Sequence, residues 1–373
     1  MNDSEKIAIQ KEEDFSLKRA KIKLYKDTNN NETFKIKKIV ISSIIIFIII
    51  AMILIKTINK LKANKYIYSL INENNNNKLK YDSNIKYEDY DKEIITDRIK
   101  KNSGWIIGLN EAQFINGIIR KNKLKNCLEI GVANGGSSIL ILNAIKDIDN
   151  SILVSLDLNK EVYNDKNKLT GYRVYKYFPE LTKNWKLYTG DQPHKFLVDL
   201  NIKFDFLFLD SAHVSPGELL NFIEALPFLN ENAIVVIHDL LWHFKKVISS
   251  KFYPSCIRLL PTLYGNKIFL SQTNKNVSNI GAVVLGPNQK NHYLDYFLLL
   301  LNFWEYIPTD KHIKDLRVFI KNYYKDEIYL NIFDTAVREN KKAIQKFLKY
   351  NNNLEEKKYL VSLGKKWNTT NNL

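Results

Sequence analysis

The stretch from Leu128 to Ile139, which reads LEIGVANGGSSI, changes from strand chemistry to helix chemistry through glycines. It starts within a short apolar run, Asn126–Ile130, of the kind that forms a buried parallel strand. An apolar segment of helical length, Ser137–Ile145, follows the glycine pair Gly135 and Gly136. A strand, a glycine turn and a helix N-terminus in this order form a cradle for a ligand, because free backbone N–H groups and the positive end of the helix dipole face the space above the strand.

The charge of this cradle indicates which ligand it accepts. A dinucleotide site uses glycines in the order G-x-G-x-x-G, and a carboxylate there would repel the pyrophosphate. Here the glycines fall at Gly131, Gly135 and Gly136, and Glu129 stands at the end of the strand. A carboxylate suits a ligand with an ammonium and a sulfonium, while the helix N-terminus takes that ligand's own carboxylate. We therefore expect S-adenosylmethionine; the alternative is a glycine loop that only turns the chain.

Beyond the cradle, apolar runs of strand length alternate with helical stretches. Such alternation predicts a Rossmann-like, doubly wound α/β fold, in which helices cover both faces of a mostly parallel sheet. The last two apolar runs have no helix between them, so we expect an antiparallel pair that completes a seven-stranded sheet. The expected strands are Asn126–Ile130, Ile152–Leu156, Trp185–Tyr188, Phe204–Leu209, Ala233–Ile237, Lys267–Ser271 and Ile280–Leu285.

Ligands of open α/β sheets bind beyond the carboxyl ends of the strands, and this sequence carries polar residues at those positions. Asp157 follows the second expected strand, where it can accept hydrogen bonds from a ribose diol; alternatively it caps a turn. Asp191 follows the third strand together with Gly190. We expect the adenine end of the ligand to lie beside them.

Acidic residues and histidines follow the next two strands. Asp210 ends the fourth strand, and His238 and Asp239 end the fifth. Neighbouring strands lie about 4.8 Å apart, so Asp210 and Asp239 can share one divalent cation. Oxygen ligands favour Mg²⁺ or Ca²⁺, whereas participation of His238 favours Mn²⁺ or iron. His213 follows Asp210 closely, and its imidazole can remove a proton from an acceptor hydroxyl. The alternatives are a helix cap at Asp239 and a surface-loop histidine at His213.

These motifs, in this order, resemble the class I S-adenosylmethionine-dependent methyltransferases. They read EIGVANGGSS at 129–138, SLD at 155–157, DFLFLDSAH at 205–213 and VVIHD at 235–239. More narrowly, the sequence looks like the branch that contains metal-dependent sugar and macrolide O-methyltransferases and cephalosporin-hydroxylase-like proteins. It departs from the metal-dependent relatives at His238, where they often carry an acidic residue. The resemblance implies cofactor contacts at Glu129, Gly131, Ser137 and Asp157, a metal at Asp210 and Asp239, and a base at His213.

The resemblance covers residues 103–286, and other segments surround it. Residues 1–38 are polar and of mixed charge, which predicts a disordered tail. Residues 39–58 begin with a charge-free run that spans about 26 Å as a helix, so we expect a single-pass transmembrane anchor. Residues 59–102 are rich in Asn, Lys and Tyr and predict a tether. Residues 287–373 predict a helical C-terminal extension.

Charge and cysteine content restrict the partners. The net charge is +16, but the lysines are spread through Asn- and Ile-rich sequence without interleaved aromatic residues, so we expect no nucleic-acid partner. Cys127 and Cys256 lie far apart and predict neither a disulfide framework nor a metal knuckle. Lysines flank the apolar run on both sides, so the positive-inside rule gives no orientation. Because S-adenosylmethionine is made in the cytoplasm, we expect the catalytic domain there.

The sequence therefore predicts a membrane-anchored methyltransferase that acts on a hydroxyl of a glycan or a lipid-linked sugar. Only the anchor motivates the lipid-linked acceptor. Two other classes remain open. One is a cephalosporin-hydroxylase-like, metal-dependent enzyme on the same fold, in which His238 and Asp239 help to hold iron. The other is a non-catalytic membrane interaction protein. The sequence leaves the oligomeric state open.

Overall fold

The structure is a computed structural model that describes residues 86–104, 107–240, 255–270 and 279–366. The expected polar tail and the expected membrane anchor at residues 39–58 lie outside these ranges. Within the described ranges, no helix is both long and apolar enough to span a bilayer. The chain divides into two units, Met1–Lys80 and Tyr81–Leu373, and all of the described residues belong to the second unit.

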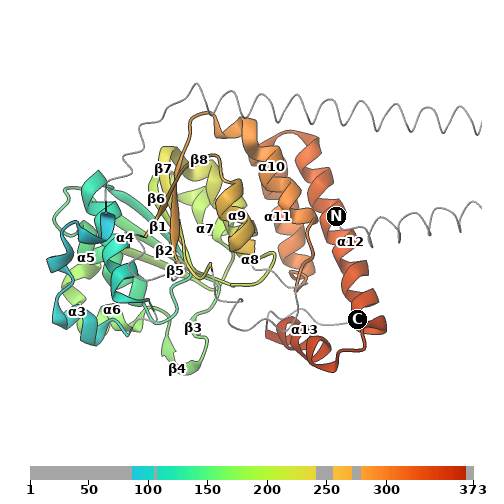
Figure 1. The fold of residues 1–373 in the computed structure, drawn as a ribbon, viewed down its shortest axis with the longest axis horizontal. Coiled ribbons are helices and arrows are strands. Elements are labelled where there is room, and N and C mark those ends of the chain that lie inside the picture. Colours follow the sequence, from blue (N-terminus) through green and yellow to red (C-terminus); the bar gives the residue numbers. More distant parts are fainter. Residues whose placement is uncertain (1–85, 105–106, 241–254, 271–278, 367–373) are drawn as a thin grey trace, which may run out of the picture. The chain divides into compact units, whose positions relative to one another are not determined.

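A seven-stranded sheet forms the centre of this unit (Figure 1). Its strands are β1 (Asn126–Ile130), β2 (Ile152–Asp157), β5 (Trp185–Thr189), β6 (Phe204–Leu209), β7 (Leu229–Ile237), β8 (Gly265–Phe269) and β9 (Gly281–Leu285). They lie in the order β5-β2-β1-β6-β7-β9-β8. The first five pair in parallel, whereas β9 pairs antiparallel with both β7 and β8. The expected mostly parallel sheet with an antiparallel strand pair is thus confirmed.

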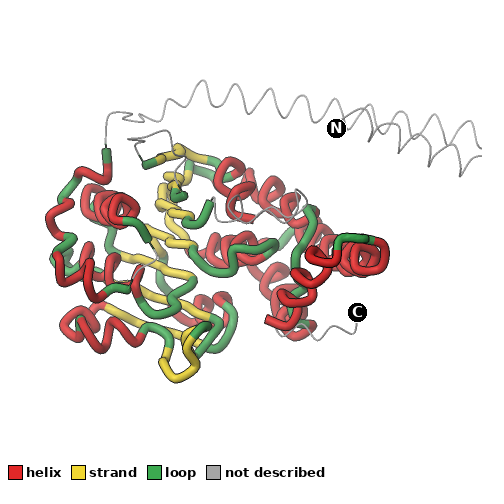
Figure 2. The backbone as a smooth tube through the Cα atoms, turned by 60° about the horizontal axis from the view of Figure 1, so that its bottom comes forward, coloured by secondary structure: helices red, strands yellow, loops and turns green. Residues whose placement is uncertain are grey.

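Helices cover both faces of the sheet, so its central strands are apolar on both sides (Figure 2). Phe206 and Phe208 of β6 enter one core, while Leu207 and Leu209 enter the other. The first core is packed by α3 (Asp97–Asn102), α4 (Leu109–Asn122), α5 (Gly136–Ile145) and α6 (Tyr172–Tyr177). The second is packed by α7 (Pro193–Leu200), α8 (Gly217–Ala225), α9 (Ser255–Thr262), α10 (Tyr293–Leu298), α11 (Asp310–Tyr324) and α12 (Glu327–Tyr350).

The C-terminal extension is helical, as expected, and ends within the described residues in α13 (Leu354–Lys366). It does not form a separate core. Trp304 and Phe333 are fully buried in the same cluster as Leu207 of β6. The hydroxyl of Tyr324 donates a hydrogen bond to the carbonyl oxygen of Ile223 in α8 at 2.6 Å. The expected boundary at residue 286 therefore does not separate two packing units.

The described part of the expected tether at residues 59–102 has regular structure. Residues 86–102 contain two short 3₁₀ helices, η1 (Tyr87–Asp89) and η2 (Lys92–Ile94), followed by α3. Ile95 and Ile99 are buried in the core beneath α4. Tyr87 and Ile94 also pack against this core, and Arg120 of α4 pairs with Asp91 at 2.7 Å, so this segment belongs to the domain.

A two-stranded antiparallel hairpin follows β2 and was not expected from the sequence. It consists of β3 (Glu161–Val162) and β4 (Asp165–Leu169). Four of the five residues of β4 are exposed, so the hairpin lacks the apolar alternation that marks a strand of the main sheet.

Candidate active site

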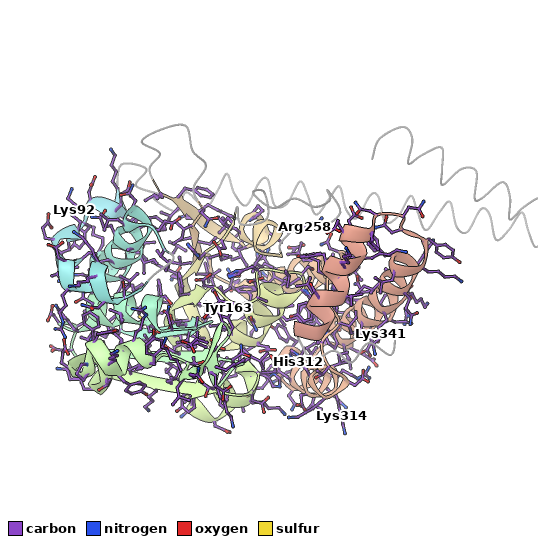
Figure 3. The ribbon with its side chains drawn as sticks, turned by 90° about the horizontal axis from the view of Figure 1, so that it is seen from below. Lys92, Tyr163, Arg258, His312, Lys314 and Lys341 are labelled. Atoms are coloured by element: carbon purple, nitrogen blue, oxygen red, sulfur yellow. The ribbon has the colours of Figure 1, made fainter. Side chains whose placement is uncertain are left out.

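A cavity of about 1120 Å³ opens where the parallel strands end. Its wall contains Ile130 of β1, Asp157 of β2, Asp210 after β6 and Asp239 after β7. This is the edge of the sheet where open α/β folds bind their ligands. Elements that the sequence analysis had not placed here also line the cavity, among them the β3–β4 hairpin with Tyr163, helix α11 with His312 and helix α13 with Tyr359; Figure 3 labels Tyr163 and His312.

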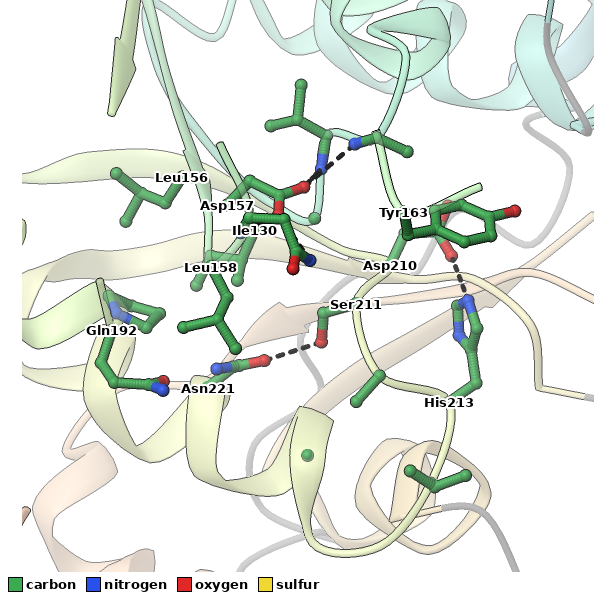
Figure 4. A pocket seen from close by; sticks show the side chains of 18 of the residues that line it. Ile130, Leu156, Asp157, Leu158, Tyr163, Gln192, Asp210, Ser211, His213 and Asn221 are labelled. Atoms are coloured by element: carbon green, nitrogen blue, oxygen red, sulfur yellow. Dashed lines mark hydrogen bonds and ion pairs between the residues drawn. The ribbon is translucent and has the colours of Figure 1, made fainter. Parts of the chain in front are cut away.

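Asp157 holds the glycine loop against the end of β2. Its Oδ2 accepts hydrogen bonds from the N–H groups of Val132 at 2.9 Å and Ala133 at 3.0 Å (Figure 4). Its Oδ1 accepts from the N–H of Asn159 at 2.8 Å. Asp157 lines the cavity as expected, and a ribose hydroxyl bound there would share oxygens that already accept hydrogen bonds from the loop.

Glu129 does not face the cavity, in contrast to the expectation. Its side chain is fully buried, and it accepts hydrogen bonds from the hydroxyls of Ser137 at 2.5 Å, Ser138 at 2.6 Å and Ser155 at 2.6 Å. Burial raises the pKa of Glu129 to about 7, although the three hydroxyls counteract it. The side chain lies under the first turn of α5 because the chain turns only after Ile130. Glu129 therefore orients the helix start, and its expected direct contact with an ammonium group is not supported.

The other expected cofactor residues are placed unequally. Gly131, Ser137 and Asp191 line the cavity. Gly135 is the N-cap of α5, adopts a φ of +94° and packs against Gly171. It therefore permits the turn into α5 without lining the cavity itself. At the far side of the cavity, the carboxylate of Asp191 lies 3.9 Å from the ammonium group of Lys311 in α11.

Asp210, His213 and Asp239 converge on one point of the cavity. One ligand atom from each lies within 4.8 Å of the others. His213 Nε2 lies 3.7 Å from Asp210 Oδ1 (Figure 4) and 3.5 Å from Asp239 Oδ2. His213 and Asp239 adopt left-handed backbone, with φ values of +57° and +54°. One imidazole and two carboxylates suit either a proton transfer or a divalent cation.

His238 lies beside this group but outside it. Its Nδ1 is 3.2 Å from Asp210 Oδ1, and its Nε2 is 3.4 Å from Glu111 Oε2. Burial disfavours the imidazolium, but Asp210, Glu111 and Asp239 outweigh burial and raise the pKa of His238 well above its ordinary value. The expected His238 therefore contacts both carboxylates, with its Nδ1 also 3.5 Å from Asp239 Oδ1, and the structure adds His213 to the same two carboxylates.

Two acidic residues of this site were missed in the sequence. Burial raises the pKa of Glu111, but His238 and the N–H of Gly108, which donates to Glu111 at 2.8 Å, lower it below its usual value. Glu218 of α8 accepts a hydrogen bond from the N–H of His213 and lies 3.6 Å from His213 Nδ1. The Gly-x-x-Glu spacing at the start of α4 was a signal for Glu111. Nothing local marks Glu218.

Residues 128–240 match the family model described as a methyltransferase domain. A search of curated proteins finds no match. Similar solved structures include the O-methyltransferase TomG from Streptomyces achromogenes in complex with SAM, with 16% identity over 51% of this chain and 91% of that chain and a TM-score of 0.38. An O-methyltransferase from Bacillus cereus in complex with SAH has 16% identity over 52% and 89%, with a TM-score of 0.39. The SAH-bound methyltransferase PaMTH1 from Podospora anserina has 15% identity over 51% and 88%, with a TM-score of 0.39.

The family model spans β1 to β7 and therefore includes the glycine loop, Asp157, Asp210 and Asp239. These are the segments on which the resemblance to class I methyltransferases was based. The chain thus contains a methyltransferase domain, at residues 128–240.

Proposed function

We propose that this protein is a membrane-anchored, S-adenosylmethionine-dependent methyltransferase that methylates a hydroxyl of a glycan or a lipid-linked sugar. The methyltransferase domain supports the reaction class. The observation that carries the hydroxyl acceptor is the convergence of Asp210, His213 and Asp239 at the cavity wall, beyond the ends of β6 and β7. The apolar run within residues 39–58 supports the anchor and, through it, the lipid-linked acceptor. The use of S-adenosylmethionine, which is made in the cytoplasm, supports a cytoplasmic domain.

The residues at the glycine-loop end of the cavity fit the cofactor. The backbone N–H groups of the first turn of α5, which includes Ser137, offer hydrogen-bond donors and a positive dipole to its carboxylate. Asp157 and Asp191 offer acceptors to its ribose hydroxyls and adenine amino group. When bound, S-adenosylmethionine supplies a methyl group on a positively charged sulfur. The protein's contribution is to hold the acceptor oxygen in line with that methyl group and to exclude water.

In this proposal, His213 takes the proton of the acceptor hydroxyl. Its imidazole faces the cavity, and the carboxylates of Asp210 and Asp239 lie close enough to stabilise the imidazolium that forms. The same three side chains could instead hold a divalent cation, which would lower the pKa of a bound hydroxyl. Sensitivity to a chelator separates the two roles, because a base-only mechanism keeps its full rate when divalent ions are removed.

Calorimetry of the full-length protein in detergent tests the cofactor. We expect one equivalent of S-adenosylmethionine to bind, whereas NAD⁺, which carries a pyrophosphate, serves as the control and should not. Absence of binding at millimolar S-adenosylmethionine would refute the proposal.

Mass spectrometry of glycans and lipid-linked sugars tests the acceptor. Cells with and without the protein should differ by species that are about 14 Da heavier, the mass that a methyl group adds. Loss of these species on removing residues 39–58 alone would tie the acceptor to the membrane. Identical glycan and lipid profiles in the two cell lines, together with cofactor binding, would mean that the acceptor belongs to another class.

A further inference from the structure

A second cluster of potential metal ligands lies behind the wall of the cavity. It consists of His194 in α7, Glu224 in α8 and His312 in α11, and one ligand atom from each lies within 4.8 Å of the others. None of the three belongs to the group formed by Asp210, His213 and Asp239. The cluster joins the methyltransferase domain to the C-terminal helices, because α11 follows that domain in sequence and packs against α7 here.

The distances in this cluster fit a small tetrahedral ion. His312 Nε2 lies 3.2 Å from Glu224 Oε1, and His194 Nδ1 lies 3.5 Å from the same oxygen. Bonds of about 2.0–2.1 Å to zinc at tetrahedral angles place neighbouring ligand atoms about 3.3–3.4 Å apart. Two of the three edges of the cluster, at 3.2 Å and 3.5 Å, lie close to this length. The rings of His194 and His312 are nearly parallel, at 13°, with centroids 6.3 Å apart.

His194 provides an independent sign of a ligand. The residue is 4% exposed, and neither of its ring nitrogens has a hydrogen-bond partner among the described residues. Its Nδ1 is near Glu224 but not in hydrogen-bond geometry. A buried polar atom without a partner costs about 1–3 kcal/mol, so such atoms usually have a protein group, a water molecule or an ion beside them. A bound cation would satisfy the nitrogen that faces Glu224.

We propose that His194, Glu224 and His312 form a metal site for Zn²⁺ or a similar divalent transition-metal ion. Two imidazoles and one carboxylate are a donor set of zinc proteins, whereas Mg²⁺ and Ca²⁺ prefer oxygen ligands alone. The carboxylate of Glu224 is fully buried, and a buried charge is costly unless a partner compensates it. The ion would compensate this charge, which hydrogen bonds alone would otherwise have to stabilise.

The metal site connects α11, which lines the active-site cavity, to α7 and α8. His312 itself lines that cavity, as do Thr309 and Lys311 beside it at the start of α11. An ion bound by His312 together with His194 of α7 and Glu224 of α8 would hold this end of α11 in place. The ion pair between Lys195 and Asp315, at 3.0 Å, supports the same contact from the surface and is weaker because it is partly exposed.

Metal analysis of full-length variants tests the site. Asp239→Asn removes a ligand of the other cluster and serves as the background. In that background we expect one Zn²⁺ per chain after stripping and reloading, and none in Asp239→Asn/His312→Gln. Glutamine can still donate a hydrogen bond to Glu224, so a purely hydrogen-bonded cluster would tolerate it. His292→Gln is the matched control, because His292 is a buried histidine that lies 3.5 Å from Asp295 and outside both clusters.

Two measurements keep the proposal open to refutation if the double variant folds poorly. Co²⁺ loaded into Asp239→Asn should give the strong visible absorption of a tetrahedral site, and Zn²⁺ should raise its thermal midpoint. Failure of Asp239→Asn to bind either ion would overturn the proposal. Equal zinc content in Asp239→Asn and Asp239→Asn/His312→Gln would overturn it as well. Loss of zinc only in Asp239→Asn/His312→Gln, with the zinc content of the His292→Gln control unchanged, would support it.

Discussion

The carboxylates at the two ends of the active-site cavity have different kinds of partners. At the glycine-loop end, Glu129 and Asp157 accept hydrogen bonds from serine hydroxyls and from backbone N–H groups. At the other end, Asp210 and Asp239 face the imidazoles of His213 and His238. The first pair fixes the backbone that shapes the cofactor site. The second pair forms charged contacts whose partners can gain or lose protons.

This difference shows that an acidic residue at a strand end does not by itself mark a ligand contact. The neighbours decide its role, because hydroxyl and N–H donors turn a carboxylate into part of the scaffold, whereas an imidazole beside it makes a proton-transfer or metal site. Substitutions at the glycine-loop end should therefore act mainly on stability. Those at the histidine end should act mainly on the reaction.

The largest effect is expected for His213→Ala. Loss of a general base or of a metal ligand should lower the methylation rate by about 10²–10⁴-fold. The free energy of unfolding should change by less than about 1 kcal/mol, because the side chain is partly exposed. The rate is measured by mass spectrometry of the methylated product, and cofactor affinity by calorimetry. A variant that keeps its rate would remove His213 from the reaction.

Glu129→Ala is the counterpart from the other end. It leaves three buried hydroxyls without their acceptor, so we expect a loss of about 3 kcal/mol in the free energy of unfolding. If the rate at fixed folded protein fell as far as in His213→Ala, the contrast between the two ends would not hold.

Gly131 lies between the two ends, and its substitution should destabilise both. It adopts a φ of +97°, and a Cβ atom there would lie 2.1 Å from the carbonyl oxygen of Asp210. We expect Gly131→Ala to cost more than about 3 kcal/mol in urea unfolding. Gly190 is the control, because its φ of +96° is the same but a Cβ would meet only the flexible Lys160 side chain. Gly190→Ala should cost about 1 kcal/mol, and equal losses would contradict the role of the backbone contact.

The pH dependence of stability should reveal Glu129. Its pKa rises from 4.5 to about 7 on folding, so the folded protein binds this proton more tightly than the unfolded chain does. The corresponding stabilisation is complete below pH 4.5 and is lost as the pH rises through about 7. The loss amounts to about 3 kcal/mol at most. Glu129→Gln cannot ionise, so its stability should fall less across this window than that of the wild type. Parallel profiles would contradict the prediction.

The fold was predictable because its signals are local. Strand-length apolar runs and a glycine turn appear in the sequence itself, and so do the polar residues that end each strand, such as Asp157 and Asp210. Glu218 and His312 were not predictable as parts of functional clusters, because only tertiary packing brings α8 and α11 to their partners. The burial of Glu129 was missed for a related reason. A strand-end position does not reveal which way the side chain points when the next element packs over it.

The smallest effect is expected for Asp157→Asn, which sharpens the comparison within the glycine-loop end. The amide keeps one acceptor oxygen, but it can no longer accept hydrogen bonds from Val132, Ala133 and Asn159 together. We expect a loss of about 1–2 kcal/mol in urea unfolding, since one hydrogen-bond donor stays unsatisfied. If Asp157 also binds the ribose, the affinity for S-adenosylmethionine should fall as well, whereas adding the cofactor should still stabilise the variant. Unchanged affinity in a destabilised variant would mean that Asp157 serves the glycine loop alone, as Glu129 serves the start of α5.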